Sequence, residues 1–240
     1  MCRKIVVLSS GGLDSTTCVG IAVKEVGADN VSTVSISYGQ RHIKELQAAK
    51  DVAAYYNVPH YEVDLSSALQ FSNCNLLAKN EDTIPDMSYA EQIADNGIGR
   101  VSTYVPFRNG LLLSAAASIA DSLYPGQEVS IYYGAHADDA CGDAYADCSS
   151  EFVDAMNKAI NIGTYHKINV VGPLVNMNKA GVVKVGLELG VPYKLTHSCY
   201  HGRDKSCGHC GTCIDRINAF RMNGVIDPIE YEEDPFKDMR

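Results

Sequence analysis

At 240 residues, of which 46% are hydrophobic and 20% charged, the chain is long enough for one sizeable globular domain and short for two independent ones. No apolar run approaches the roughly 20 residues that a membrane span needs, so a membrane role is not expected. The net charge is −9 and Lys and Arg form no dense cluster, which makes direct binding to nucleic acid unexpected.

Short β-branched apolar runs alternate along the chain with longer helical patterns. This alternation predicts the α/β class, with a parallel twisted sheet of about five strands flanked by helices. The strands are expected over Lys4–Leu8, Val31–Tyr38, His60–Asp64, Val129–Gly134 and Lys167–Val171. The helices are expected over Ser15–Val26, Ile43–Tyr56, Asn109–Leu123, Glu151–Ile162, Lys179–Leu189 and Cys213–Met222. Several strand segments lack polar alternation, as strands covered on both faces do.

Residues 66–102 break this pattern. The stretch is polar, contains Pro85, Gly97 and Gly99, and shows no clear strand. Two interpretations stay open, namely a lid that orders over a bound ligand and a surface insertion without a catalytic part.

The cellular compartment is indicated by the N-terminus and by the cysteines. Two basic residues precede a short apolar run, but this run ends at Ser9 and is too short for a signal peptide. Nine cysteines would suit a secreted disulfide-rich protein, yet four of them lie within fifteen residues near the C-terminus, a clustering that favours a metal site. We therefore expect a reducing, cytoplasmic location.

A glycine turn follows the first expected strand, where the sequence reads SSGGLDSTTC and continues as a helix. Such a turn lets backbone N–H groups and the positive end of a helix dipole converge on an anion, and glycine permits close approach of the backbone to a phosphate. A phosphate would repel the Asp14 carboxylate unless a cation lay between them. The position of Asp14 therefore favours a Mg²⁺ ion that bridges this carboxylate and the phosphates. The alternative is an ordinary capped helix start that binds no ligand. The turn matches neither the Walker A motif nor the GxGxxG motif.

Four cysteines near the C-terminus have the spacing C-x7-C-x2-C-x2-C. They are Cys199, Cys207, Cys210 and Cys213, with glycines between them. Tetrahedral Zn²⁺ takes four thiolates, which leave no open position, so residues 199–213 are predicted to be a structural zinc-binding segment with one Zn²⁺ per chain. An iron–sulfur cluster, which four cysteines also bind, is the alternative metal site.

The order of the motifs resembles that of a known family. The turn SGGLDSTT resembles the SGGxDS pyrophosphate loop of the ATP pyrophosphatases. It is followed by Ser37-Tyr38-Gly39-Gln40-Arg41-His42, then by Val105-Pro106-Phe107-Arg108-Asn109, then by the four-cysteine site. Together these segments resemble the 7-cyano-7-deazaguanine synthase family over nearly the whole chain.

The resemblance implies a single ATP-pyrophosphatase-type domain over residues 1–240, with the adenine nucleotide alpha hydrolase-like fold. It implies an ATP-dependent ligase that converts 7-carboxy-7-deazaguanine and ammonia to 7-cyano-7-deazaguanine in the queuosine pathway. Two rounds of adenylation release AMP and pyrophosphate, with Mg²⁺ accompanying ATP. A homodimer is also implied. Because this chemistry needs placed donors and positive charge, no nucleophilic residue is expected.

The resemblance also assigns site residues by position. ATP is assigned to Leu8, Ser9, Ser10, Gly11, Gly12, Leu13, Asp14, Ser15, Thr16, Thr17 and Cys18. The catalytic residues are expected to be Asp14, Arg41, His42 and Arg108. The substrate is assigned to Tyr38, Gln40, Lys44, Asn109, His136, Asp138, Asp139 and Asp147. Carboxylates suit this set because they accept the N–H donors of a guanine-like edge, whereas surface ion pairing is the alternative for the basic residues.

Three other functions stay open. Residues 136–152 depart from the pattern expected for the family, so one alternative is a relative that stops at the 7-amide. A tRNA-thiolating enzyme would need a sulfur-carrying cysteine pair outside the metal cluster, which the sequence does not show. A nucleotide-binding module without catalysis is disfavoured by Asp14, since a pocket that only binds gains little from a carboxylate beside phosphates.

Overall fold

Five parallel strands form a single sheet in the computed structural model, which describes residues 3–40, 44–72, 74, 76–77, 85–87, 91, 103–140 and 145–240. The strands are β1 (Lys4–Leu8), β2 (Val31–Ser37), β3 (His60–Asp64), β4 (Val129–Tyr132) and β5 (Ile168–Val171). Their order across the sheet is β3-β2-β1-β4-β5, and every neighbouring pair is parallel. The predicted fold class is therefore confirmed.

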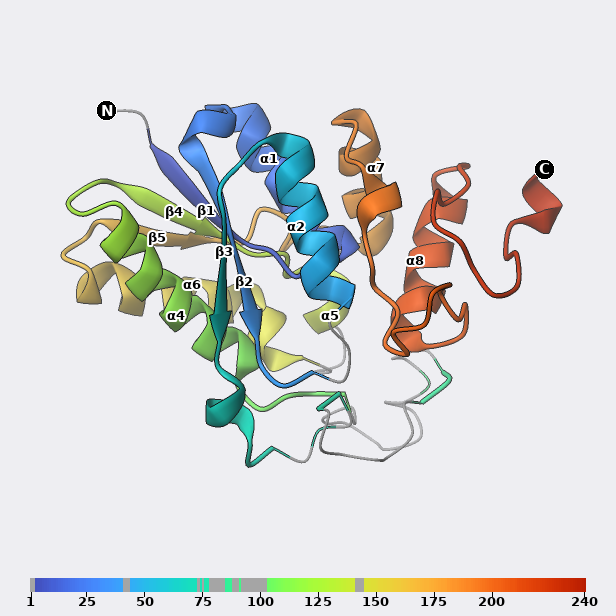
Figure 1. Ribbon diagram of the computed structural model, residues 1–240, viewed down its shortest axis with the longest axis horizontal. Helices are drawn as coiled ribbons and strands as arrows, with labels where there is room; N and C mark the ends of the chain where they lie inside the picture. Colours follow the sequence, from blue (N-terminus) through green and yellow to red (C-terminus); the bar gives the residue numbers. More distant parts are fainter. Residues whose placement is uncertain are drawn as a thin grey trace.

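Helices cover both faces of this sheet (Figure 1). In chain order they are α1 (Leu13–Val26), α2 (Lys44–Tyr56), α4 (Arg108–Leu123), α5 (Ala137–Ala140), α6 (Ser150–Gly163), α7 (Lys179–Glu188) and α8 (Gly211–Met222). Short 3-10 helices cover Ala28–Asn30, Ser66–Leu69, Ala146–Cys148, Tyr193–Leu195 and Lys237–Met239. On one face lie α1 and α2, and on the other lie α4 and α6. Helix α7 packs against both α1 and α8.

Two hydrophobic cores result from this layering. In β1, Ile5 and Val7 point into the core shared with α1, α2, α7 and α8, whereas Val6 points into the core shared with α4 and α6. All three side chains are fully buried. Burial on both faces of the sheet explains why the strand sequences lack polar alternation.

The helix after β1 begins earlier than the predicted start at Ser15. It starts at Leu13 because Gly12 takes the extended conformation of an N-cap, with φ −79° and ψ 175°. This places Asp14 in the first turn of the helix rather than in the loop. Residues 66–102, predicted as a lid or an insertion, lie largely outside the described residues.

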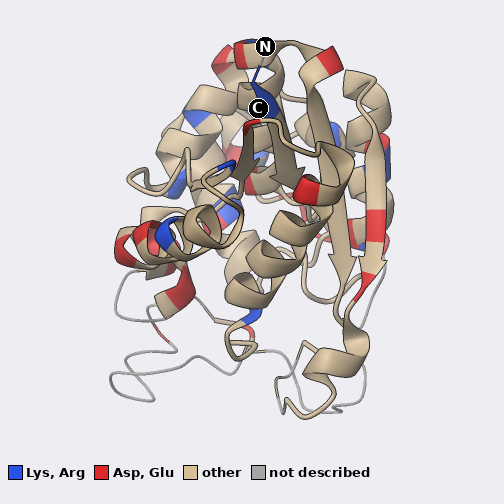
Figure 2. Ribbon diagram, turned by 90° about the vertical axis from the view of Figure 1, so that its left-hand side faces the viewer, with Lys and Arg blue, Asp and Glu red and all other residues tan. Residues whose placement is uncertain are grey.

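Charges of both signs are distributed over the molecule. Figure 2 shows acidic and basic residues interspersed on the side that faces the viewer. Within the described ranges, no helix is both long and apolar enough to cross a membrane.

Gly11 lies where α2 packs on the loop after β1. Its φ of +77° is in the left-handed region, and a Cβ built there would lie 2.2 Å from the Glu45 carbonyl oxygen and 2.6 Å from the Ala49 nitrogen. Because either the loop or α2 must move, we expect Gly11→Ala to lower the free energy of unfolding by about 3 kcal/mol. Urea unfolding followed by circular dichroism measures this change.

Gly27→Ala is the matched control for this substitution. Gly27 has nearly the same φ, +79°, but a Cβ built on it would meet nothing within 4 Å. Only the backbone conformation is then penalised, at about 1–2 kcal/mol, because φ +79° with ψ 152° is a region that residues other than glycine rarely adopt. Equal losses in the two variants would contradict the contact between Gly11 and α2 as the cause.

Candidate active site

A cavity of about 240 Å³ opens at the carboxyl edge of the sheet, where β1, β2 and β4 end. Open parallel sheets bind ligands at this edge. The walls come from the loop after β1, the ends of β2 and β4, the starts of α4 and α7, and the segment around the start of α8. The cavity therefore joins motifs that lie far apart in the sequence.

Many of the predicted site residues lie in the wall of this cavity. From the ATP set, the wall includes Leu8, Ser9, Ser10, Gly12, Asp14 and Ser15. From the catalytic and substrate sets, it includes Tyr38, Gln40, Arg108, Asn109 and Asp139. The other ATP residues lie outside the wall, in the loop or the first turns of α1, and are Gly11, Leu13, Thr16, Thr17 and Cys18.

Lys44 is the only one of the three predicted basic residues after β2 that the structure describes, and it lies outside the cavity wall. Lys44 lies on the surface, with 2.6 Å between its Nζ and Asp204 Oδ1. This contact is the surface ion pairing that the sequence left open. Arg41 and His42 lie outside the described residues.

Two of the predicted carboxylates hold helix starts. Asp138 accepts the backbone N–H of Lys179, the first residue of α7, through Oδ2 at 2.7 Å. The buried Asp147 accepts the backbone N–H of Asn109, in the first turn of α4, through Oδ2 at 3.0 Å. Both carboxylates lie outside the cavity wall and fix helices whose first residues lie in it.

The loop after β1 is held by its own side chains. The hydroxyls of Ser10 and Ser15 lie 3.1 Å apart, and the Ser10 N–H donates to Ser15 Oγ at 3.1 Å. The Gly12 N–H donates to Ser10 Oγ at 3.3 Å. The N-cap of α1 is Gly12, which has no side chain that could block the helix start, so the positive end of the helix dipole faces the cavity beside the Gly12 backbone.

Lys179 is a candidate site residue that the sequence analysis missed. Its Nζ lies 2.6 Å from Asp14 Oδ2 and 3.1 Å from His136 Nε2, and Lys179 lies in the cavity wall. His136, which is 1% exposed, also lies 3.2 Å from Asp139 Oδ2 through Nε2. The signal for Lys179 is its position, because it opens a helix after the fifth strand at the same edge where Asp14 follows the first.

Asp14, His136, Asp139 and Lys179 form one cluster. Their charges and their burial shift the pKa values of Asp14, Asp139 and Lys179. Burial raises the pKa of Asp14, but Lys179 and His136 outweigh burial and hold that pKa below its ordinary value. Burial lowers the pKa of Lys179, but Asp14 and Asp139 outweigh it and raise that pKa. Burial raises the pKa of Asp139, and the opposing pull of His136 and Lys179 is weaker. At neutral pH, an ionised Asp14 therefore faces a protonated Lys179.

A second group in the cavity consists of Tyr38, Glu45 and Arg108. Arg108 donates from Nη1 to the Tyr38 hydroxyl at 3.3 Å, and its guanidinium carbon lies 5.3 Å from the ring centroid. Burial raises the pKa of Tyr38 to about 12, so its phenol stays neutral. Burial also raises the pKa of Glu45 to about 7, against the lowering effect of Arg108. A cation, a neutral hydroxyl and a carboxyl that titrates near neutrality thus line the cavity together.

The raised pKa of Glu45 predicts a pH-dependent stability. A carboxyl with a pKa near 7 in the folded state and near 4.5 in the unfolded state stabilises the fold below about pH 4.5, and this contribution is lost as the pH rises through 7. Glu45→Gln should remove the loss, so that from about pH 4.5 to 8 its free energy of unfolding gains about 2 kcal/mol relative to wild type. Urea unfolding across this range tests the prediction, and parallel pH profiles would contradict it.

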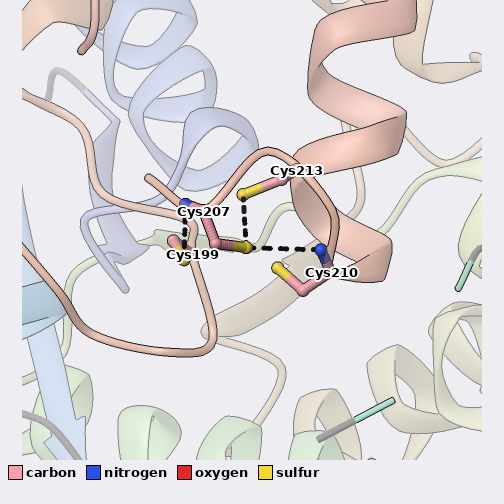
Figure 3. A group of neighbouring side chains, drawn as sticks. All are labelled: Cys199, Cys207, Cys210 and Cys213. Atoms are coloured by element: carbon pink, nitrogen blue, oxygen red, sulfur yellow. Dashed lines mark hydrogen bonds between the residues drawn. The ribbon is translucent and has the colours of Figure 1, made fainter. Parts of the chain in front are cut away.

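The four predicted metal ligands converge at the start of α8 (Figure 3). The Sγ atoms of Cys199, Cys207, Cys210 and Cys213 all lie within 4.8 Å of one another, and all four residues are buried. Cys207 Sγ and Cys213 Sγ are 3.9 Å apart. Two sulfurs that each lie about 2.3 Å from one tetrahedral ion are separated by about 3.8 Å. The ligand set is therefore positioned to hold a metal ion.

Comparison with known proteins identifies relatives over nearly the whole chain. The family model described as queuosine biosynthesis protein QueC matches residues 4–224. The 7-cyano-7-deazaguanine synthase of Pseudoalteromonas atlantica is 41% identical over 97% of this chain and 100% of that protein. The 7-cyano-7-deazaguanine synthase of Caldicellulosiruptor saccharolyticus is 43% identical over 96% of each chain.

A solved structure has the same fold. NMN synthetase from Francisella tularensis matches with a TM-score of 0.50 over 92% of this chain and 77% of that one. At 15% identity this likeness concerns the fold alone. The family itself is shown by the match over residues 4–224 and by relatives that are 41% and 43% identical. The chain belongs to the queuosine biosynthesis protein QueC family.

Proposed function

We propose that this protein is a 7-cyano-7-deazaguanine synthase, an ATP-dependent ligase that uses 7-carboxy-7-deazaguanine and ammonia. The observation that carries the proposal is one cavity that combines the start of α1 with its N-cap glycine, the Asp14–Lys179 ion pair and the Arg108 guanidinium. These features suit a polyphosphate, its metal ion and a planar carboxylate respectively. The chain that forms this cavity is 41% identical to a synthase of that name.

The phosphate end of the cavity suits Mg²⁺-ATP. Asp14 Oδ1 is buried and has no hydrogen-bond partner among the described residues, so this oxygen fits a Mg²⁺ ligand. The ion would neutralise phosphate charge when bound. The β and γ phosphates are proposed to lie against the Ser10, Gly12 and Ser15 part of the loop. Lys179, released from Asp14, then brings its positive charge to the phosphates.

The proposed reaction consumes two ATP molecules. A carboxylate oxygen of the substrate attacks the α phosphorus, the bond to the β phosphate breaks, and pyrophosphate leaves. Ammonia adds to the activated carbon and loses a proton as AMP departs, which gives the amide. The amide oxygen is adenylated in the same way, and departure of the second AMP with loss of two N–H protons gives the nitrile. Lys179 stabilises the charge on the leaving pyrophosphate in both rounds.

Arg108 is the proposed ligand of the substrate carboxylate. Its guanidinium has a planar fork that matches a carboxylate, and its contact with Tyr38 fixes its direction. Asn109 is held next to it by the carboxylate of Asp147. The substrate contacts predicted for the other assigned residues stay predictions, and so do the catalytic roles predicted for Arg41 and His42.

We propose Zn²⁺ as the ion of the four-cysteine site. All four sulfurs lie within 4.8 Å of one another, which suits a single tetrahedral ion, whereas an iron–sulfur cluster distributes its four thiolates over two or four irons and spaces some of them more widely. Metal analysis of protein purified without added metal should give about one Zn²⁺ per chain. A brown chromophore would contradict zinc.

The free cysteines support a proposed cytoplasmic location. Cys18 and Cys148 are buried free thiols, and Cys199, Cys207, Cys210 and Cys213 are placed as metal ligands, as expected in a reducing compartment. The homodimer implied by the family resemblance stays a prediction, which light scattering of the purified protein tests.

The synthase assignment is tested by product analysis. Purified protein with 7-carboxy-7-deazaguanine, ammonium and Mg²⁺-ATP should release two AMP and two pyrophosphate for each nitrile formed. Release of ADP, or AMP release that does not depend on the substrate, would sink the proposal. A final product heavier than the nitrile by one water would favour the amide-forming ligase instead.

A further inference from the structure

The segment that enters the four-cysteine site also contacts the phosphate loop. The His197 N–H donates to the Gly11 carbonyl at 2.9 Å, and the Leu13 N–H donates to Ser198 Oγ at 3.4 Å. Cys199 follows Ser198 directly in the chain. The loop proposed to bind phosphate and the site positioned to hold metal are therefore joined by one short stretch of backbone.

Two side chains of α8 hold Ser198 in place by hydrogen bonds. Thr212 Oγ1 donates to the Ser198 carbonyl at 2.7 Å, and Arg216 Nη1 donates to Ser198 Oγ at 3.3 Å. Arg216 is 1% exposed and pairs with Asp227 through hydrogen bonds of 2.6 and 2.9 Å. We name residues 196–216, which include the four cysteines, the metal-held unit. The position of Ser198 is thus set by contacts inside this unit.

The hydroxyl of Ser198 can donate a hydrogen bond to a ligand. A serine hydroxyl accepts through two lone pairs and donates one proton. Its oxygen accepts from the Leu13 N–H and from Arg216 Nη1, which uses both lone pairs. Ser198 also lies in the cavity wall, and a Cβ built on Gly12 would lie 3.7 Å from its Oγ. The proton is therefore available on the cavity side, and the guanidinium behind it strengthens the hydroxyl as a donor to an anion.

We propose that Ser198 is a pyrophosphate-binding residue, which the metal-held unit supplies to the phosphate loop. The unit forms a second wall of the phosphate site. A bound metal ion would act as a positioning element for this wall, because cysteine ligands lie directly beside Ser198 and on both sides of Thr212. The inference rests on the proposed function for the identity of the anion, the pyrophosphate moiety of ATP.

Binding of Mg²⁺-pyrophosphate to the full, metal-loaded chain tests this role by isothermal titration calorimetry. Ser198→Ala should raise the Kd about tenfold, because it removes a charge-assisted hydrogen bond. Ser198→Thr keeps a hydroxyl and should restore most of the affinity. Thr212→Val frees the Ser198 carbonyl and should raise the Kd about threefold.

Ser206→Ala is the matched control. Ser206 is buried in the same unit and precedes Cys207, but it lies outside the cavity wall. This variant should bind pyrophosphate as wild type does. Unchanged affinity in Ser198→Ala would overturn the proposal. Equal losses in Ser198→Ala and Ser206→Ala would also overturn it, because they would indicate general damage to the unit.

The same titration separates this inference from the proposed function. A wild-type protein that binds pyrophosphate through Ser198 but releases no AMP with 7-carboxy-7-deazaguanine would refute the synthase assignment and leave the role of Ser198 standing. Full turnover by the wild-type protein, together with undiminished pyrophosphate affinity in Ser198→Ala, would support the synthase assignment and refute the role of Ser198.

Discussion

Lys179→Met should lower kcat/KM for ATP by about 10² to 10³-fold while the protein stays folded. The ammonium group of Lys179 is the cation paired with Asp14, at 2.6 Å, and the proposed mechanism uses it to stabilise the leaving pyrophosphate. Loss of one preorganised group that stabilises charge in a transition state typically has an effect of this size. Initial rates of pyrophosphate release, measured over a range of ATP concentrations, give the change.

Lys184→Met is the control for that substitution. Lys184 lies on the exposed side of the same helix, so its loss changes the net charge equally without changing the cavity. We expect it to turn over ATP at the wild-type rate. Equal rates in Lys179→Met and wild type would rule out the proposed role of the Lys179 ammonium.

Removal of the proposed Zn²⁺ ion should unfold the C-terminal part of the chain. Binding of a structural zinc ion contributes about 10 kcal/mol or more in small domains, which is comparable with the whole free energy of unfolding of a typical protein. Treatment with a strong chelator, or the substitution Cys213→Ser, should therefore lower the Tm by about 10 °C or more. Calorimetry together with metal analysis of the same samples measures both effects.

Cys18→Ser distinguishes loss of metal from loss of a buried thiol. Cys18 is fully buried in α1 and lies apart from the four-cysteine site. Its substitution should lower the Tm, because it places a polar hydroxyl in the apolar core. The metal content and the response to chelator should stay unchanged. A chelator that removes the ion from wild type without shifting its Tm would show that the site is not structural.

The strands could be predicted because most of them are short β-branched apolar runs, and β3 alternates polar residues with Tyr61 and Val63. β1 and β3 occupy the predicted residues, Lys4–Leu8 and His60–Asp64. The order β3-β2-β1-β4-β5 could not be predicted, since pairing in a parallel sheet depends on how the crossovers pack. The start of α1 at Leu13 was missed because an N-cap glycine in extended conformation is not distinguished in sequence from a loop glycine.

Site residues were predictable where their partners are close in sequence. The four cysteines form a compact motif whose spacing indicates a metal site, whereas the glycine turn alone indicates an anion site and was interpreted as a pyrophosphate loop through the family resemblance. Lys179 reaches Asp14 across 165 residues, and Ser198 reaches Leu13 across 185, so these contacts arise only from tertiary packing. In the sequence, Lys179 is simply a lysine at the start of a helical pattern, and Ser198 is a serine before a cysteine.

The buried pair of Arg216 and Asp227 joins the end of the chain to its interior. The family match ends at residue 224, yet Asp227 and Tyr231, which donates to it at 2.8 Å, lie beyond that boundary. A guanidinium deprived of its buried carboxylate costs on the order of 3–5 kcal/mol. A chain that ended at residue 224 would leave the Arg216 guanidinium buried without its carboxylate partner. A fragment for biophysical work should therefore extend at least to Tyr231.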